Sequence, residues 1–485
     1  MARKWQWGDF MADDDDVFDV IVIGAGPAGE TAAQRAVRNG LTAAVVERRL
    51  AGGECQHYGC VPSKALLWPM ELAAEVSRMP GIELRNPIDP APVLARRDGF
   101  VDHQDDAPQV RAIKDMPAVF VRGEGRLSGE RHVQVSAADG SDRALTARHA
   151  VVLATGSDPW IPDVPGLREA RPWTNREATD VHEVPKRLVV LGGGPVGCEM
   201  SQALHALGAE EVTILAGRDH LLPRHEPFAG DLLAQSFRDA GIAVRLGRSA
   251  ARVERPIADG TVTVRADDGS LTEADQILVA TGRRPNSTDI GLELAGIPAA
   301  NGPITVDDSM RAVGVPGGWL YAVGDVNGRS LLTHMGKYQA RVCADVIAAR
   351  ARGLPDNGHA LRDTADDRGA PQAIFTDPQV CAVGRTEASA RADGFSVRTV
   401  EYDMAKVEGA VLQADGYTGR VKVVIDEASR TLLGFTLVGP AVVDHLYAAT
   451  IAVTSELPLE QLWHAVPAFP SVSEFWLGLL EEYGL

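Results

Sequence analysis

Two cysteines, Cys55 and Cys60, lie five residues apart in the run GGECQHYGCVPSK and are the side chains best suited to chemistry. Pro62 suits the first position of a helix, so we expect the Cys60 thiol near unpaired backbone N–H groups and the positive end of a helix dipole. Such a position favours the thiolate, which donates charge to an electron acceptor, attacks disulfides or binds a soft metal. The pair therefore predicts a redox centre. The alternative interpretation is that both are ordinary core cysteines.

A glycine-rich turn upstream of the cysteines predicts a bound dinucleotide. The segment FDVIVIGAGPAGETAAQRAVRNGLTAAVVE reads as strand, turn, helix and second strand, with Gly24, Gly26 and Gly29 in GxGxxG spacing. Glycines at this spacing allow a tight turn, a close approach to a pyrophosphate and close packing of helix on strand. Glu47 ends the second strand, where a carboxylate can accept hydrogen bonds from the ribose hydroxyls of an adenosine.

A second copy of this pattern, KRLVVLGGGPVGCEMSQALHALGAEEVTILAGR, predicts a second nucleotide. Its glycines are Gly192, Gly194 and Gly197. In place of Glu47 it has Ala216, followed by Arg218 and Arg224. No carboxylate is there to repel a 2′-phosphate, and Arg218 can make a bidentate contact to one. The second site is therefore expected to prefer NADPH, with NADH possible.

These motifs, together with ATG at 154–156, ATGRRPN at 280–286 and YAVGD at 321–325, are ordered as in a known family. The chain resembles the pyridine nucleotide-disulfide oxidoreductases, the group of glutathione reductase, dihydrolipoamide dehydrogenase and mercuric reductase. The resemblance runs from about Val17 to about Leu480 and identifies the chain as an NAD(P)H-dependent flavoprotein enzyme. It implies FAD at the first glycine turn and the nicotinamide coenzyme at the second.

The resemblance assigns cofactor roles to further residues. Asp325 would hold the flavin ribitol, and a helix opening near His334 and Met335 would aim its positive end at the flavin N1 and C2 carbonyl. Lys64 and Glu199 match the lysine and glutamate that pair beside flavin N5. Cofactor contacts are also implied at Thr155, Gly156 and Gly282.

The same resemblance implies a path for electrons. Hydride passes from NADPH to the flavin, which reduces a Cys55–Cys60 disulfide, so that Cys60 becomes the thiolate near the flavin and Cys55 faces the substrate. The alternative from another class is a flavin-binding protein whose catalysis is vestigial.

The C-terminal run FPSVSE departs from the HPTxxE-like segment of disulfide-reducing relatives. Phe469 stands where those enzymes have a proton-shuttling histidine, while Glu474 is retained. A phenyl ring cannot accept a proton, and a general base is commonly worth ~10²–10⁴ in rate. His464, or His57 and Tyr58 in the cysteine loop, could supply the proton instead.

Because of this departure, the sequence does not identify the electron acceptor. A small-molecule disulfide is the first expectation, and a metal ion, as in mercuric reductase, or a quinone are the alternatives. No resident metal is predicted.

Composition restricts the partners and the compartment. The chain has 48 basic and 66 acidic residues and a net charge of −18, which argues against nucleic acid or an anionic membrane as a partner. No stretch approaches the roughly 20 apolar residues of a membrane span, and the N-terminal run lacks the apolar core of a secretion signal, so we expect a cytoplasmic protein. Cys198, Cys343 and Cys381 are expected to be ordinary buried thiols.

The length of 485 residues implies about three domains. The expected fold class is α/β, with two Rossmann-like dinucleotide-binding domains, for FAD and NAD(P)H, and a C-terminal α+β dimerisation domain. The predicted ranges are a disordered leader at 1–16, FAD-binding parts at 17–156 and 283–353, an NAD(P)H-binding domain at 157–282, a linker at 354–370 and a dimerisation domain at 371–485. The resemblance implies a homodimer in which the last segment completes the partner's active site.

Two local expectations concern regular structure. Pro69 falls inside the helix predicted after the cysteines and should kink or end it. The apolar runs at 117–127, 132–138 and 149–156 are expected to form a β-meander packed on the first sheet.

Overall fold

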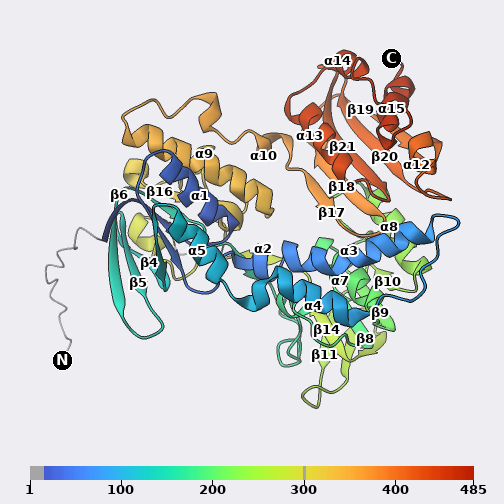
Figure 1. The fold of residues 1–485 in the computed structure, drawn as a ribbon, viewed down its shortest axis with the longest axis horizontal. Coiled ribbons are helices and arrows are strands. Elements are labelled where there is room, and N and C mark those ends of the chain that lie inside the picture. Colours follow the sequence, from blue (N-terminus) through green and yellow to red (C-terminus); the bar gives the residue numbers. More distant parts are fainter. Residues whose placement is uncertain (1–15, 299–301) are drawn as a thin grey trace. The chain divides into compact units, whose positions relative to one another are not determined.

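The computed structural model describes residues 16–298 and 302–485, so residues 1–15 of the predicted leader lie outside the described residues. The chain divides into two compact units (Figure 1). The first contains Met1–His57, Gln104–Asp158 and Arg284–Thr364, and the second contains Tyr58–His103, Pro159–Arg283 and Ala365–Leu485. The domain ranges predicted from the sequence stay predictions.

The first unit is built on a seven-stranded sheet of order β3-β2-β1-β6-β5-β4, with β16 also paired to β6. Its strands are β1 (Val17–Ile23), β2 (Ala43–Glu47), β3 (Ala118–Arg122), β4 (Glu124–Gly129), β5 (His132–Ser136), β6 (Asp142–Leu153) and β16 (Leu320–Ala322). The start of β6 pairs antiparallel with β5, and the rest runs parallel to β1. The expected meander exists as β4, β5 and the start of β6, but it continues the first sheet through the long strand β6 and does not pack on it.

Alternating side chains of β1 fill two cores of this unit. Val20 and Val22 pack with α1 (Pro27–Arg38) and α9 (Thr333–Ala351), while Ile21 and Ile23 face the opposite core. This period of two is typical of a strand buried on both faces. The other helical segments of the unit are α2 (Gly53–His57), α5 (Ala107–Asp115), η3 (Leu292–Ala295), η4 (Pro316–Gly318), η5 (Gly324–Asn327) and η6 (His359–Leu361).

An ion pair joins the two helices that cover one face of this sheet. The Arg35 guanidinium of α1 donates from Nε and Nη2 to the two carboxylate oxygens of Asp345 in α9, at 2.6 and 2.8 Å. Asn39 donates to the same carboxylate at 2.7 Å. This contact ties the C-terminal halves of α1 and α9 together in one layer.

The second unit contains a parallel sheet of order β10-β9-β8-β14 and a small antiparallel sheet of order β11-β12-β13. The strands are β8 (Arg187–Leu191), β9 (Glu211–Ala216), β10 (Ala243–Leu246), β14 (Gln276–Val279), β11 (Ala250–Glu254), β12 (Val262–Ala266) and β13 (Leu271–Ala274). Its helices here are α3 (Cys60–Ser77), α4 (Pro90–Phe100), α6 (Asn175–Thr179), α7 (Pro195–Ala206) and α8 (Pro227–Asp239). Helix α3 continues through Pro69, so of the two expected effects, a kink or an end, this proline does not end the helix.

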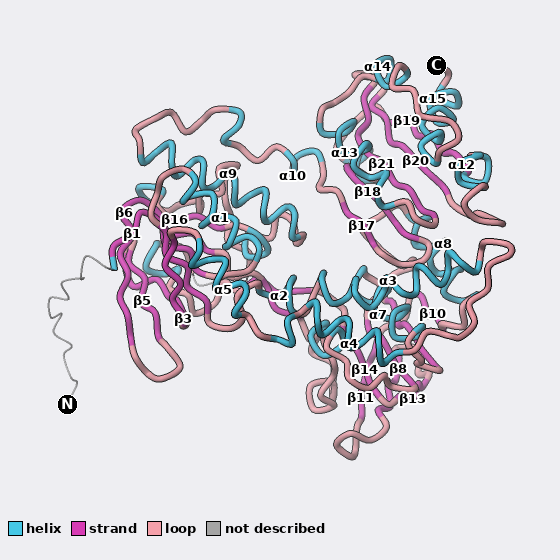
Figure 2. Tube along the Cα trace, in the orientation of Figure 1, coloured by secondary structure: helices cyan, strands magenta, loops and turns pink. Residues whose placement is uncertain are grey.

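The C-terminal part of the second unit is a five-stranded sheet of order β17-β18-β21-β20-β19 (Figure 2). Its strands are β17 (Gln372–Ile374), β18 (Gln379–Gly384), β19 (Val397–Asp403), β20 (Arg420–Asp426) and β21 (Thr431–Gly439). The helical segments are α10 (Ala365–Arg368), α11 (Glu387–Ala392), η7 (Met404–Lys406), α12 (Glu408–Val411), η8 (Val443–His445), α13 (Leu446–Thr454), α14 (Leu459–Trp463), η9 (Val472–Glu474) and α15 (Phe475–Tyr483).

Three short segments lie where the chain passes from one unit to the other: η2 (Asp102–Gln104), β7 (Ser157–Pro159) and β15 (Arg283–Pro285). Over the described residues, no helix has the combination of length and apolar character needed to cross a bilayer. The predicted α/β class, with two dinucleotide-binding folds and a C-terminal α+β part, is confirmed.

Candidate active site

The first glycine turn joins β1 to α1, and its backbone approaches neighbouring carbonyl groups too closely for any residue but glycine. Gly24 has φ +108°, and a Cβ built there would lie 2.3 Å from the Ala154 carbonyl oxygen. A Cβ on Gly29 would lie 1.9 Å from the Gly24 carbonyl oxygen. The N-terminus of α1 is therefore held close against the ends of β1 and β6, as a pyrophosphate-binding turn requires.

The second glycine turn repeats this geometry between β8 and α7. A Cβ on Gly192, which has φ +117°, would lie 2.4 Å from the Ala280 carbonyl oxygen, and one on Gly197 would lie 2.0 Å from the Gly192 carbonyl oxygen. A Cβ on the middle glycine, Gly194, would meet no atom within 4 Å. That open space at a helix N-terminus suits an approaching phosphate.

Glu47, at the end of β2, faces the first glycine turn. Its Oε2 accepts the Ala25 N–H at 2.8 Å and its Oε1 accepts the Arg49 N–H at 2.7 Å. Each carboxylate oxygen has a second lone pair, so the predicted contact to ribose hydroxyls is compatible with these bonds. The first turn and Glu47 fit the adenosine and pyrophosphate of FAD.

A buried carboxyl that we did not predict, Glu30, lies in the first turn of α1. Its Oε1 is fully buried with no hydrogen-bond partner among the described residues. Burial raises the pKa of Glu30 to about 7, helped by Glu47 and opposed by Lys337 and the Gly52 N–H. An orphaned polar atom beside the predicted pyrophosphate turn fits a site that a cofactor completes. An acid in a first helical turn was the available sequence signal, but it reads first as complementing the helix dipole.

Asp325, in η5, is held by Ser157, whose hydroxyl donates to Oδ2 at 2.6 Å. The Thr155 hydroxyl donates to the Asn286 carbonyl at 2.7 Å, and Gly156 has φ +70°. These contacts bring the ATG, ATGRRPN and GD motifs together in the first unit. The polar groups of the predicted flavin site are therefore positioned by neighbouring loops.

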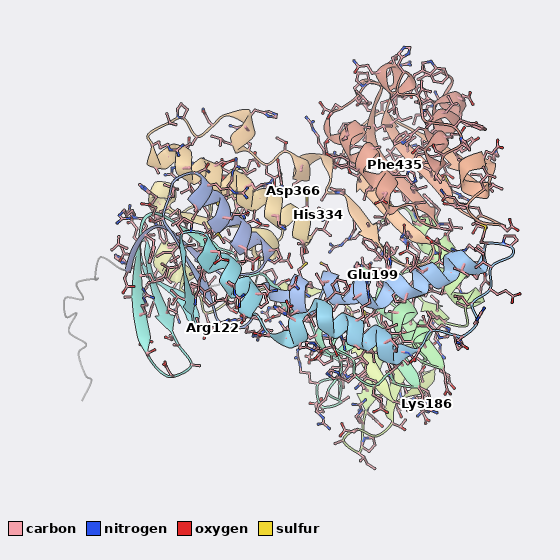
Figure 3. All side chains as sticks on the ribbon, viewed as in Figure 1. Arg122, Lys186, Glu199, His334, Asp366 and Phe435 are labelled. Atoms are coloured by element: carbon pink, nitrogen blue, oxygen red, sulfur yellow. The ribbon has the colours of Figure 1, made fainter. Side chains whose placement is uncertain are left out.

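Helix α9 begins at Thr333, as the predicted flavin-facing helix requires. His334, labelled in Figure 3, is exposed, whereas Met335 is buried. The positive end of the helix dipole at this terminus favours a negatively charged group.

In the second unit, Lys64 of α3 pairs with Glu199 of α7. The Lys64 Nζ lies 2.7 Å from Glu199 Oε2, and Glu199 Oε1 accepts the Phe375 N–H at 2.9 Å (Figure 3). The Lys64 ammonium also lies 4.8 Å from the centroid of the Phe375 ring. Glu199 is 7% exposed and Lys64 31% exposed, so one end of the pair remains accessible. The predicted pairing exists, and Phe375 is a contact that the sequence analysis missed.

The two cysteines belong to different units of the chain, Cys55 to the first and Cys60 to the second. Cys55 is half-buried in α2, and Cys60 is exposed at the first residue of α3. Pro62 is therefore the third residue of the helix, two positions later than expected. Because the first four N–H groups of a helix make no bond within it, Cys60 still lies at the helix end that favours a thiolate.

His57 and Tyr58 were considered as proton donors. His57 is fully buried, and its Nε2 lies 2.7 Å from the Ala51 carbonyl oxygen. Such a ring is not accessible to an acceptor, so this role of His57 is not supported. Tyr58 uses its carbonyl to accept a bond from Asn175 at 2.8 Å.

The other cysteines are inert, as expected. Cys198, Cys343 and Cys381 are buried. Burial raises the pKa of the Cys381 thiol to about 12 and raises the pKa of the Cys198 and Cys343 thiols as well. None of these three thiols forms a thiolate near neutral pH.

The predicted coenzyme residues lie at loops after the parallel strands. Arg218 and Arg224 follow β9 and are both exposed. Gly282 has φ +145°, and its carbonyl accepts the Trp160 N–H at 3.0 Å. Arg218 can therefore meet a phosphate from solvent, whereas Arg224 lines a small cavity described below.

The C-terminal segment uses Glu474 structurally. Glu474 Oε2 accepts the Ser471 N–H at 3.3 Å and caps η9. Phe469 is 69% exposed, and His464 is exposed at the end of α14.

A histidine that we did not predict, His445, places Nδ1 3.1 Å from the Ser473 hydroxyl, and burial lowers the pKa of His445.

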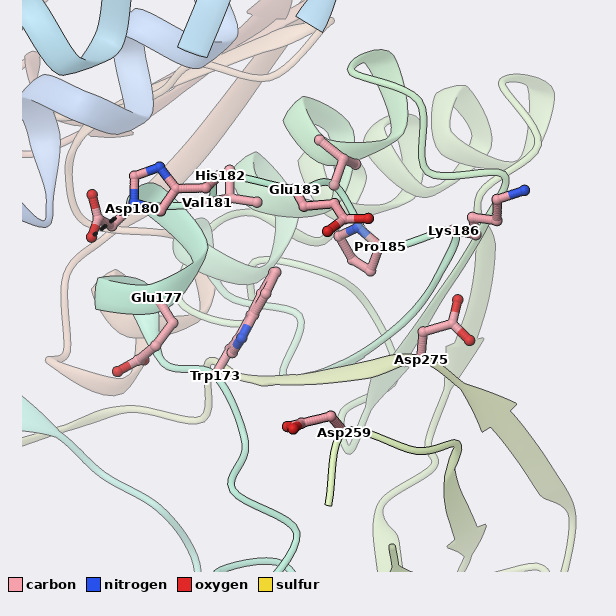
Figure 4. A pocket seen from close by; sticks show the side chains of 11 residues that line it. Trp173, Glu177, Asp180, Val181, His182, Glu183, Pro185, Lys186, Asp259 and Asp275 are labelled. Atoms are coloured by element: carbon pink, nitrogen blue, oxygen red, sulfur yellow. Dashed lines mark ion pairs between the residues drawn. The ribbon is translucent and has the colours of Figure 1, made fainter. Parts of the chain in front are cut away.

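A separate hollow of about 660 Å³ lies beside Trp173 in the second unit (Figure 4). Five carboxylates line it, and Lys186 and His182 are the lining residues that can carry a positive charge. None of the predicted site residues lines it. The five are Glu177, Asp180, Glu183, Asp259 and Asp275. This acidic lining disfavours an anionic dinucleotide.

Known proteins share these features along nearly the whole chain. The family model for pyridine nucleotide-disulphide oxidoreductases matches residues 18–345, and the model for that family's dimerisation domain matches residues 370–478. Dihydrolipoyl dehydrogenase of Chlamydia muridarum is 31% identical over 468 residues, covering 95% of this chain and 96% of the relative. Mercuric reductase of Shigella flexneri is 33% identical over 451 residues, covering 91% of this chain and 77% of the relative.

A solved structure agrees with the fold. LpdA from Mycobacterium tuberculosis matches with a TM-score of 0.81 and 26% identity, covering 96% of this chain and all of the LpdA chain (100%). The dimerisation domain supports a homodimer. The chain belongs to the pyridine nucleotide-disulfide oxidoreductase family and is an NAD(P)H-dependent flavoprotein oxidoreductase with FAD as its cofactor.

Proposed function

We propose that Cys55 and Cys60 form a redox pair that passes electrons, taken from NADPH, to a small-molecule disulfide. The observation that carries this proposal is the Lys64–Glu199 pair at 2.7 Å on the helix that begins with Cys60. An ion pair held by a backbone N–H from Phe375 keeps a lysine ammonium fixed one helical turn from the thiol. Such an arrangement suits a site where negative charge is created and removed.

The residues around the first glycine turn would hold FAD. The N-terminus of α1 would bind the pyrophosphate, Glu47 the adenosine ribose and Asp325 the ribitol, and the positive end of α9 would stabilise negative charge on the flavin. When bound, FAD accepts an electron pair from NAD(P)H and delivers it to the cysteine pair. Arg218 after β9 favours the 2′-phosphate of NADPH.

The cysteines complete the reaction by thiol–disulfide exchange. In the reduced pair, the Cys55 thiolate attacks one sulfur of the acceptor and releases the first product thiolate, which takes a proton. The Cys60 sulfur, as thiolate, then attacks Cys55, re-forms the Cys55–Cys60 bond and releases the second product thiolate. The acceptor gains two electrons from the cysteine pair and two protons from water, because both cysteines react as thiolates and Phe469 can supply no proton.

A thiophilic metal ion is a second candidate acceptor. The specific observation in its favour is the C-terminal segment, where Phe469 replaces the expected base and Glu474 is engaged as a cap. A soft metal ion binds thiolates directly and needs no proton on reduction. The mercuric reductase relatives are consistent with this acceptor.

The test is NADPH oxidation by the FAD-loaded protein with a panel of disulfides, quinones and mercuric ion. Wild type should reduce at least one disulfide, and Cys55→Ala should abolish that activity while NADPH still reduces the flavin. Turnover of mercuric ion alone would favour the second candidate, and quinone turnover that survives Cys55→Ala would show direct transfer from flavin. A flavin that NADPH cannot reduce would overturn the proposal in favour of a binding protein with vestigial catalysis.

Phe469→His tests the missing base. The variant should gain disulfide turnover by up to ~10²-fold if the proton supply limits the rate. Phe469→Tyr, which keeps the ring and adds a hydroxyl, is the matched control for a change in packing.

A further inference from the structure

A small cavity in the second unit lies between the segment before α8 and the C-terminal sheet. Its volume is about 170 Å³, roughly the space of five water molecules. Its charged and polar lining residues are Arg224, His225, Gln372, Arg385, Thr386 and Thr436. No carboxylate is among the described residues that line it, so every charge facing the cavity is positive.

His225 is the residue that indicates a missing ligand. Its side chain is 7% exposed, and Nδ1 has no hydrogen-bond partner among residues 16–298 and 302–485. Gln372 lines the cavity beside this ring, and Nδ1 is left for another group. A buried ring nitrogen without a hydrogen bond is destabilising, so a ligand that bonds to it is favoured.

Arg224 supplies a positive charge that no described carboxylate neutralises. The neighbouring charges are satisfied: Arg385 pairs with Asp393 at 2.8 Å, and Lys422 pairs with Glu226 at 2.9 Å and with Glu387 at 2.8 Å. The pocket therefore has one uncompensated guanidinium beside an unsatisfied imidazole. Arginine binds tetrahedral oxyanions through two parallel N–H groups.

We propose that this cavity binds a small oxyanion, such as inorganic phosphate, at a site separate from the coenzyme site. Arg224 provides the charge, and His225 and the hydroxyl and amide side chains provide hydrogen bonds. The cavity is far too small for a dinucleotide but large enough for one tetrahedral anion and a water molecule. The anion would bridge the segment before α8 to β18 and β21, since α8 packs beside β21 (Figure 1).

The same chemistry has a second source, the 2′-phosphate of NADPH, because Arg224 follows β9 in the predicted coenzyme loop. The test must separate the two. Inorganic phosphate is titrated calorimetrically into the full-length, FAD-loaded protein at constant ionic strength, with chloride as the compensating anion. We expect one phosphate per chain, and Arg224→Gln should weaken its binding at least tenfold.

Arg218→Gln is the matched control, because it removes an exposed arginine of the same loop that does not line the cavity. It should leave phosphate affinity within twofold. Competition between phosphate and adenosine 2′-monophosphate, or a greater loss in Arg218→Gln than in Arg224→Gln, would assign the anion to the coenzyme and overturn the proposal. Folded wild type without a phosphate heat would overturn it as well. Should Arg224→Gln fail to fold, the competition measurement and His225→Asn, expected to weaken binding severalfold, decide the question.

Discussion

The Lys64–Glu199 pair makes a prediction at the scale of single residues. Glu199→Gln keeps an oxygen for the Phe375 N–H but leaves the Lys64 ammonium without its partner. The loss should cost about 1–3 kcal/mol of unfolding free energy, because Lys64 is partly exposed. We also expect slower flavin reduction by NADPH in stopped-flow absorbance. Glu75→Gln, an exposed change on α3, the helix of Lys64, is the control, and equal effects of both variants would contradict a role for the pair.

The buried Glu30 carboxyl predicts a pH dependence of stability. Because the folded pKa is raised from 4.5 to about 7, the folded state holds this proton more tightly than the unfolded state. Stability from this group is therefore greatest below pH 4.5, falls as the pH rises to about 7, and is constant above. The loss amounts to at most about 3 kcal/mol. Glu30→Gln should flatten this part of the urea-unfolding profile, and an unchanged slope in the variant would contradict the assignment.

Some residues of the candidate site could be predicted from the sequence and others could not. Glu47, Lys64 and Glu199 could be predicted because each follows a local motif at fixed spacing. Phe375 could not, since its N–H bonds to a residue 176 positions away and any residue type supplies an N–H. The burial of His57 was also hidden, because a single loop residue carries no periodicity that shows which way it faces.

At the scale of elements, the two glycine turns should respond differently to the same small change. Gly24→Ala places a Cβ 2.3 Å from the Ala154 carbonyl oxygen at φ +108°, so the purified protein should lose its FAD. Gly197→Ala places a Cβ 2.0 Å from the Gly192 carbonyl oxygen, so the protein should stay yellow while the KM for NADPH rises at least tenfold. The readouts are flavin absorbance and steady-state kinetics.

Gly99→Ala in α4 is the control for these substitutions. Gly99 has open space around it, and alanine is the better helix former by about 1 kcal/mol. This variant should keep both FAD and coenzyme binding. Retention of FAD by Gly24→Ala would contradict the assignment of the first turn.

Elements were predicted well where a short sequence pattern determines the local backbone conformation. They were predicted less well where the pairing of strands distant in sequence determines the structure. The turns before α1 and α7 have fixed glycine spacing, so their positions followed from sequence. The continuity of β6 from the antiparallel to the parallel pairs depends on β5 and β1 flanking it in space. No local signal distinguishes that strand from one that packs on the sheet.

At the scale of the whole molecule, the dimerisation domain predicts dependence on a partner subunit. Large apolar side chains remain exposed on this domain, including Tyr447 at 73% and Ile451 at 47%. Ile451→Glu should weaken the homodimer, because a buried, unpaired charge at an interface is costly. Sedimentation velocity should show monomers, with acceptor reduction lost and flavin reduction by NADPH retained. Full acceptor turnover by such monomers would contradict a shared active site.

The two glycine turns are sterically almost interchangeable. At both, three residues separate the first strand from the helix. A Cβ on the first glycine would lie 2.3 or 2.4 Å from a carbonyl oxygen, and a Cβ on the last glycine would lie 1.9 or 2.0 Å from one. The backbone itself therefore excludes side chains at these positions, whichever dinucleotide is bound. The residue that closes the second strand is under no such exclusion, and it is Glu47 in one motif and Ala216 in the other.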